Sequence, residues 1–95
     1  MTSKKSLPTK VTISPDALYE DLDGKIVILN FQKEKYYTLD EIGSDMWKLF
    51  NEKNNTEEVI KQLLEDYDVD EEKLTNDLAD LISKLSDSGL VTINY

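Results

Sequence analysis

Carboxylates are the main chemically active side chains of this 95-residue chain, which has 20 acidic and 11 basic residues but no histidine and no cysteine. Their most suggestive spacing is Asp66, Asp68 and Asp70, which is similar to the start of a calcium-binding EF-hand loop. That loop requires glycine at its sixth position and glutamate at its twelfth, where this chain has Glu71 and Asp77. We therefore expect no metal ion here, and interpret the segment as a solvated loop whose acids complement the next helix N-terminus.

The sequence lacks the nucleophiles, bases and metal ligands on which most enzymes depend. Nucleophilic catalysis needs a nucleophile beside a base, most often histidine, and transition-metal sites use histidine and cysteine ligands. The three glycines are scattered, so there is no glycine-rich phosphate loop. Many pairs of acidic residues could in principle serve acid–base catalysis, but no pair has a spacing that distinguishes it from the others. The sequence therefore predicts a protein that is not an enzyme and that has no cofactor.

The net charge of −9 argues against nucleic-acid binding. Proteins that bind DNA draw most of their affinity from a basic face that displaces phosphate counterions. Here the lysines are scattered, with Lys4, Lys5 and Lys10 near the N-terminus and Lys33 and Lys35 at an expected turn. A DNA-binding regulator is thus a remote alternative, which salt-dependent binding to duplex DNA would favour.

Length and hydropathy predict one small domain. We expect residues 1–10 to be a flexible tail and residues 11–95 to form the domain. The longest aliphatic run, Ile26–Leu29, is far shorter than the roughly 20 residues of a membrane-spanning helix. No apolar stretch typical of a signal peptide follows the N-terminal lysines, and without cysteine there is no need for an oxidising compartment. The expected location is the cytoplasm.

The first half of the chain has the pattern of β-strands. Two β-prone runs, Ala17–Leu22 and Lys25–Asn30, are joined by Asp23 and Gly24. An Asp-Gly pair in this position favours a hairpin, because both central residues of a type I′ turn need positive φ. A polar turn then leads to a third strand, Lys35–Leu39. Three consecutive strands predict an antiparallel meander whose last strand lies at an edge unless another segment covers it.

Beyond this point the apolar period changes from two to 3.6 residues, which predicts helices. The first helix runs from about Glu41 to Lys53, with Asp40 as its N-cap and Thr38 as a rival cap. The chain's only tryptophan, Trp47, lies one turn after Gly43. We expect the absence of a side chain at Gly43 to leave room for the indole. The apolar face of this helix consists of Ile42, Met46, Leu49 and Phe50.

Two more helices are expected. The second begins after a cap at Asn55 or Thr56, and the third begins after a cap at Asp70. Gly89 is placed to end the third helix in the left-handed conformation. The apolar faces consist of Val59, Ile60, Leu63, Leu64 and Tyr67 in the second helix, and of Leu74, Leu78, Leu81, Ile82 and Leu85 in the third.

The predicted fold class is α+β, with three strands followed by three helices. Short additional strands are possible at Val11–Ser14 and Leu90–Tyr95. If the third strand is a free edge and the third helix lies beside it, an extended peptide could add as a fourth strand between them. The candidate lining residues are Tyr36, Tyr37, Thr38, Leu74, Asp77, Leu78 and Leu81. The alternative is that the tyrosines, Trp47 and the helical stripe are ordinary sheet and core residues.

The stretch "YYTLDEIGSDMW" and the later "LSDSGLV" give the chain a resemblance to PqqD-like proteins, the recognition elements for ribosomally made, modified peptides. The resemblance spans about residues 17 to 93 and is carried by Tyr36, Tyr37, Leu39, Asp40, Gly43, Trp47, Gly89, Leu90 and Val91. It implies a winged helix-turn-helix-like domain that binds the leader segment of a precursor peptide. The leader would add beside the third strand, against the third helix, and be presented to modifying enzymes.

The resemblance also implies partners and roles for individual residues. It favours the stand-alone recognition protein of a lasso-peptide pathway, which works with a leader peptidase and a cyclase; the alternative is a PqqD-type chaperone for a radical-SAM enzyme. In either case the strand would supply edge hydrogen bonds, three leucines of the third helix an apolar floor, and Asp77 a contact to a polar or basic leader side chain. The expected peptide-binding residues are Lys35, Tyr36, Tyr37, Thr38, Leu39, Leu74, Asp77, Leu78 and Leu81.

Overall fold

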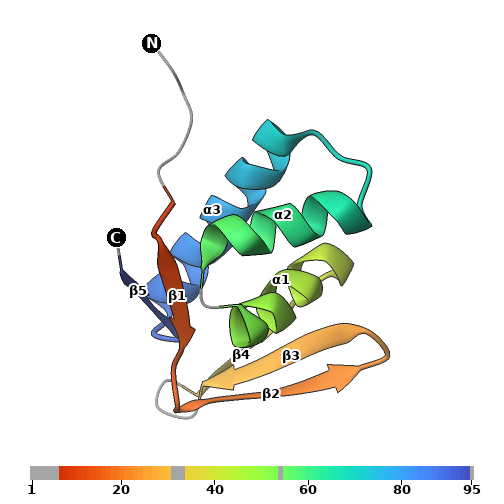
Figure 1. Ribbon diagram of the computed structural model, residues 1–95. Helices are drawn as coiled ribbons and strands as arrows, with labels where there is room; N and C mark the ends of the chain where they lie inside the picture. The colour runs from red at the N-terminus through yellow and green to blue at the C-terminus, as the bar shows by residue number, and fades with distance from the viewer. Residues whose placement is uncertain (1–6, 31–33, 54, 95) are drawn as a thin grey trace.

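The computed structural model describes residues 7–30, 34–53 and 55–94, and its main body is a meander followed by three helices (Figure 1). The elements are β1 (Lys10–Ile13), β2 (Ala17–Leu22), β3 (Lys25–Asn30), β4 (Lys35–Thr38), α1 (Glu41–Glu52), α2 (Thr56–Asp66), α3 (Glu71–Asp87) and β5 (Val91–Asn94). This order confirms the predicted α+β class. Four residues named above lie outside the described ranges, namely Lys4, Lys5, Lys33 and Tyr95.

The meander forms as the sequence predicts. β2 and β3 are joined through Asp23 and Gly24, whose φ values of 55° and 88° are those of a type I′ turn. The Gly24 amide also donates a hydrogen bond to Asp21 Oδ1 at 2.8 Å. The strand order is β2-β3-β4, antiparallel throughout, so β4 is an outer strand of this sheet.

A second, two-stranded sheet joins the ends of the described chain. β1 and β5 coincide with the two extended segments expected from the sequence, but their antiparallel pairing was not predicted. Thr56, at the start of α2, anchors the segment before β1 by donating from its amide to Thr9 O at 3.0 Å and from Oγ1 to Pro8 O at 2.6 Å. The flexibility expected of residues 1–10 stays a prediction, and residues 1–6 lie outside the described residues.

Each helix begins at an acid or amide cap. Asp40 caps α1 by accepting from the Gly43 amide, so the rival cap Thr38 is wrong. Asn55 rather than Thr56 caps α2, and Asp70 caps α3. No helix in the described part of the chain is long and apolar enough to cross a membrane.

The end of α3 turns the chain sharply into β5. Gly89 has φ 75°, and the amides of Gly89 and Leu90 donate to the carbonyls of Ser86 and Leu85 at 3.0 and 2.9 Å. This pair of bonds is the Schellman arrangement that Gly89 predicted. It fixes where α3 stops relative to the sheet.

The core lies between the inner face of the meander and the helices. Trp47 is fully buried there, and its ring meets Tyr19 of β2 edge-on, with centroids 5.3 Å apart. The predicted reason for Gly43 is wrong. A Cβ on Gly43 would lie 3.0 Å from Asp40 Oδ1 and 3.5 Å from Leu39 Cβ, so the glycine makes room for the N-cap rather than for the indole.

Candidate functional site

β4 offers a free backbone edge within the described residues, since it pairs with β3 on one side and with no described strand on the other. The Leu39 amide donates to Ile26 O at 2.9 Å. Because hydrogen-bonded pairs alternate along an antiparallel ladder, Tyr37 and Lys35 also bond to β3. The amides and carbonyls of Tyr36 and Thr38 therefore point to the open side.

Ser44 ties this strand to the first turn of α1. The Ile26 amide donates to Ser44 Oγ at 2.8 Å, and the same hydroxyl donates to Leu39 O at 3.2 Å. The Ser44 hydroxyl thus lies between the Ile26 amide and the Leu39 carbonyl, which face one another at the end of the β3–β4 ladder. Ser44 is fully buried, so the bridge satisfies two backbone groups away from water. It holds the end of β4 at a fixed position over α1.

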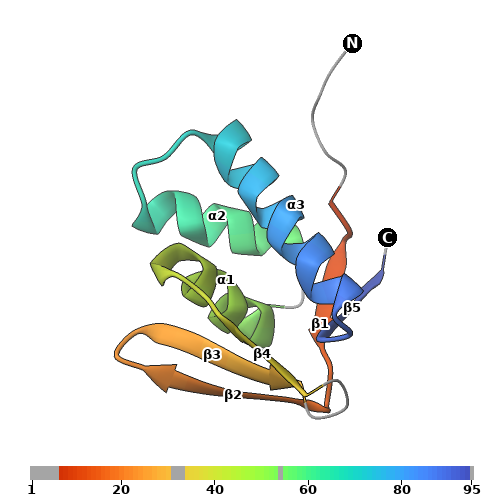
Figure 2. The ribbon, with the colours of Figure 1, turned by 180° about the vertical axis from the view of Figure 1, so that it is seen from behind.

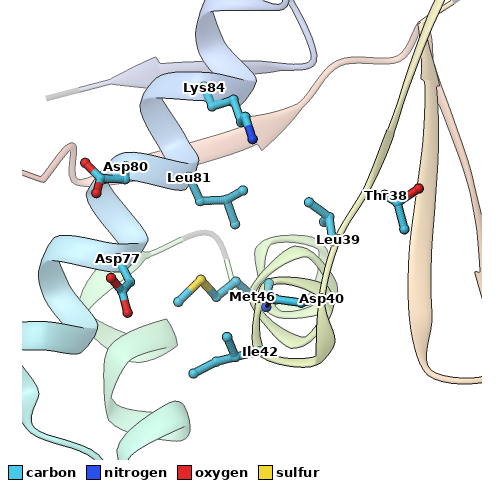
Figure 3. A pocket seen from close by; sticks show the side chains of 10 residues that line it. Thr38, Leu39, Asp40, Ile42, Met46, Asp77, Asp80, Leu81 and Lys84 are labelled. Atoms are coloured by element: carbon cyan, nitrogen blue, oxygen red, sulfur yellow. Dashed lines mark hydrogen bonds between the residues drawn. The ribbon is translucent and has the colours of Figure 1, made fainter.

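A groove of about 470 Å³ lies between this β4–α1 junction and α3 (Figure 3). Its apolar side chains come from three elements and point toward the space between the helices, namely Leu39, Ile42, Met46 and Leu81. Polar residues complete the lining, namely Thr38, Asp40, Asp77, Asp80 and Lys84, together with Gly43. An apolar floor with polar groups on its walls is the composition typical of a binding site for a peptide or small molecule.

Outside the groove, hydrogen bonds join the sheet to the end of α3. The hydroxyls of Tyr37 and Ser88 lie 2.7 Å apart. Asn30 Nδ2, from β3, donates to Ser88 O at 2.8 Å, and the Asn30 side chain is buried. These bonds attach the C-terminal end of α3 to two strands, so they set the distance between β4 and the helix.

The groove is acidic on balance. Asp40, Asp77 and Asp80 contribute carboxylates, whereas Lys84 is the single basic lining residue. Asp40 is engaged as the α1 cap, and Asp77 accepts an ion pair from Lys73 at 3.0 Å. The Lys73–Asp77 pair is exposed, so it stabilises the fold little and leaves the carboxylate accessible to a ligand.

Two polar contacts hold α1 against its neighbours. The Tyr67 hydroxyl, at the end of α2, donates a hydrogen bond to Asp45, and this bond to the carboxylate raises the pKa of Tyr67 well above its usual value. On the other side, the Lys48 ammonium lies 3.0 Å from Asp21 of β2 and lowers the pKa of that carboxyl. Both contacts keep α1, the shared wall of sheet and groove, in place.

The structure brings only part of the predicted site together. Thr38, Leu39, Asp77 and Leu81 line the groove. Lys35, Tyr36 and Tyr37 lie on β4 but outside the lining, with Tyr36 73% exposed and Tyr37 bonded to Ser88. The lining residues that sequence reasoning missed are Asp40, Ile42, Gly43, Met46, Asp80 and Lys84.

Leu74 and Leu78 do not form the expected floor, because they are 1% and 0% exposed in the core. The residues of α3 that line the groove are Asp77, Asp80, Leu81 and Lys84. This face is turned by about 90° from the core stripe that contains Leu74 and Leu78. Of the three expected leucines only Leu81 contributes to the apolar floor, and the rest of the floor belongs to α1 and to Leu39 before it.

The acidic segment before α3 is not gathered into a metal site. Among the described residues, no group of three or more acidic side chains is arranged to hold an ion. Asp70 instead accepts the Lys73 amide at 3.1 Å as the cap of α3.

Residues 25–91, most of the chain including the edge strand and all three helices, match the family described as "Coenzyme PQQ synthesis protein D (PqqD)". The chain belongs to the PqqD family. No curated protein matches it.

Two solved structures are similar to this PqqD-family chain. One, described as "TbiB1 in Complex with the TbiA(beta) Leader Peptide", is 30% identical, with a TM-score of 0.80 over 84% of this chain and 93% of that one. The other, described as "Lasso peptide synthetase B1 complexed with the leader peptide", is 18% identical, with a TM-score of 0.78 over 87% of this chain and 98% of that one. The second likeness concerns the fold alone.

Proposed function

We propose that this protein is a recognition protein that binds the leader segment of a ribosomally synthesised precursor peptide and delivers it to modifying enzymes. The observation that carries the proposal is the free edge of β4 beside an apolar groove. Strand addition at such an edge gives affinity through main-chain bonds, while pockets for alternate side chains give specificity.

The register of β4 defines how a leader would lie. In an antiparallel addition, leader residues opposite Tyr36 and Thr38 exchange backbone hydrogen bonds with those residues, and their own side chains point away from the helices. Leader residues opposite Tyr37 and Leu39 point inward, because facing residues of paired strands share a side of the sheet. The residue opposite Leu39 then meets the apolar floor formed with Met46 and Leu81.

The comparisons support this proposal. Both similar structures are described as complexes with a leader peptide, one of them of a lasso-peptide protein. The acidic groove lining favours a leader with a basic side chain beside its apolar anchor, for which Asp77 and Asp80 are the expected contacts.

The role proposed is not catalytic, and its partners are a leader peptidase and a cyclase of a lasso-peptide pathway. The alternative is a chaperone that presents its precursor to a radical-SAM enzyme, which the name of the matched family favours. The genes next to this one discriminate between the two, since each pathway encodes different enzymes beside a short precursor gene. We also propose that the protein acts in the cytoplasm, as expected from the sequence.

Calorimetric titration tests the proposal directly. The probes are the leader segment of the precursor encoded beside this gene and the TbiA(beta) leader peptide, with a scrambled leader of equal charge as the control. We expect saturable binding of one leader to one protein and no binding of the scrambled peptide. Equal affinity for native and scrambled leaders, or binding of duplex DNA in place of any leader, contradicts the proposal.

A further inference from the structure

The groove lining contains one basic side chain, Lys84, whose charge is not paired within the described ranges. Lys84 lies in the last turn of α3 and is exposed. Its ammonium group forms no ion pair or hydrogen bond with another described residue, whereas Lys48 and Lys73 are each paired with an aspartate at 3.0 Å. Figure 3 shows the ammonium group directed from α3 toward the strand side of the groove. Lys84 is therefore available to a charged group of the leader.

The order of residues along the groove follows from the contact between Tyr37 and Ser88, whose hydroxyls lie 2.7 Å apart. Figure 2 shows that β4 and α3 run in opposite directions, with the start of β4 near the end of α3. Lys84 is four residues before Ser88, about 6 Å along the helix axis. Leu39 is two residues after Tyr37, about 7 Å along the strand. Lys84 and Leu39 both line the groove, and these similar distances place them at about the same level.

The opposite charge lies toward the other end of the groove. Asp77 is seven residues before Lys84, about 10 Å further along α3, and Figure 3 shows it on the side of Met46 and Ile42. Leu81, which belongs to the apolar floor, lies between the two charged residues in α3. The groove is therefore acidic toward the start of α3, apolar in its middle and basic toward the end of the helix.

A leader that adds antiparallel to β4 meets these parts of the groove in a fixed order. Its residue opposite Leu39 points to the apolar floor and is the anchor, and the next inward residue, opposite Tyr37, comes two positions later. The Tyr37 hydroxyl is already bonded to Ser88, so the charged group next to this leader side chain is Lys84, whose flexible four-carbon stem lets the ammonium approach it. A carboxylate is favoured there, because the protein as a whole, with a net charge of −9, repels one elsewhere.

We propose that Lys84 is a specificity-determining residue that selects leaders with an aspartate or glutamate two positions after the apolar anchor; this inference rests on the proposed function. The interaction is an ion pair between the Lys84 ammonium and the leader carboxylate at the rim of the groove. The ion pair also selects the direction of the leader, since a leader that added parallel to β4 would need its carboxylate two positions before the anchor.

The test exchanges the charges on both partners. The probes are synthetic copies of the leader encoded beside this gene, whose apolar anchor is located by alanine scanning, with glutamate, glutamine or lysine placed two positions after that anchor. The proteins are the wild type, Lys84→Glu and a matched control, Lys61→Glu, which makes the same charge change at an exposed residue of α2 outside this groove. Calorimetric titration at low and high salt gives the dissociation constant of each pair.

We expect the wild type and Lys61→Glu to bind the glutamate leader about fivefold to tenfold more tightly than the lysine leader, with the glutamine leader between them. Lys84→Glu should reverse this order. The preference should become smaller at high salt, because an exposed ion pair is screened. A lysine that only complements the helix C-terminus would affect the binding of all three leaders equally, so it would not produce a reversal.

The same order of the three leaders in the wild type and in Lys84→Glu would overturn the inference. A reversal in Lys61→Glu as well would also overturn it, since net charge rather than position would then decide the preference. A reversal that occurs only with the charge two positions before the anchor would overturn the antiparallel direction. Lys84→Gln, which should remove the preference, repeats the measurement if circular dichroism shows that Lys84→Glu is unfolded. If the wild-type protein binds no leader at all, the proposed function itself fails.

Discussion

The β4 register predicts that only alternate leader amides contribute to binding. Replacing a leader amide by a backbone ester removes one N–H donor and retains the side chain. Leader residues opposite Tyr36 and Thr38 donate to β4 carbonyls, so an ester at either position loses one hydrogen bond. A net contribution of about 1 kcal/mol per hydrogen bond corresponds to about fivefold weaker binding, and two such esters to about thirtyfold.

The intervening leader residues supply the internal control. Their amides point away from β4, so esters there should change the dissociation constant by less than about twofold. Isothermal titration calorimetry of a series of leaders, each with one ester, measures the pattern. Losses that are equal at all positions, or largest at the residues opposite Tyr37 and Leu39, would refute the register derived from the Leu39–Ile26 bond. Proline should show the same alternation, since it too lacks the donor.

Three further predictions concern the protein itself. Ser44→Ala breaks the buried bridge between β3 and the end of β4, and should lower the free energy of unfolding by about 1–3 kcal/mol in urea denaturation; an unchanged value would show that the bridge is not needed. Leu81→Asp places a charge in the groove, and should weaken leader binding by about tenfold or more in a titration, whereas Val69→Asp should not; equal effects would contradict the groove assignment. The raised pKa of Tyr67 means that its neutral form stabilises the fold. Stability should therefore be complete below the unfolded-state value of about 10 and decline as pH rises above it, and Tyr67→Phe should remove that part of the decline in denaturation at a series of alkaline pH values.

The sequence predicts those parts of the fold that depend on local signals. The Asp23-Gly24 turn, the caps at Asp40 and Asp70, and the stop at Gly89 each depend on the conformational preference of one or two residues, and the structure confirms all of them. The pairing of β1 with β5 was not predicted, because it joins segments from opposite ends of the chain and no local pattern specifies it.

The site was harder to predict than the fold for a physical reason. A 3.6-residue period identifies which face of α3 is apolar, and most of that face is core. The period therefore predicted the buried Leu74 and Leu78 together with Leu81, which does line the groove. The groove uses the neighbouring face, where Leu81 stands among charged residues and gives no strong pattern. Ser44 and Ser88 were also missed, since a serine that bridges backbone groups or ends a helix has no distinctive spacing.

Amide hydrogen exchange at β4 tests the central claim most directly. In the free protein the amides of Tyr36 and Thr38 point to the open edge, whereas that of Leu39 is already bonded to Ile26. When the leader saturates the protein, exchange at Tyr36 and Thr38 should slow by about tenfold or more, with a smaller change at Leu39. If both edge amides exchange at their free rates while the leader is bound, the leader does not add as a strand to β4.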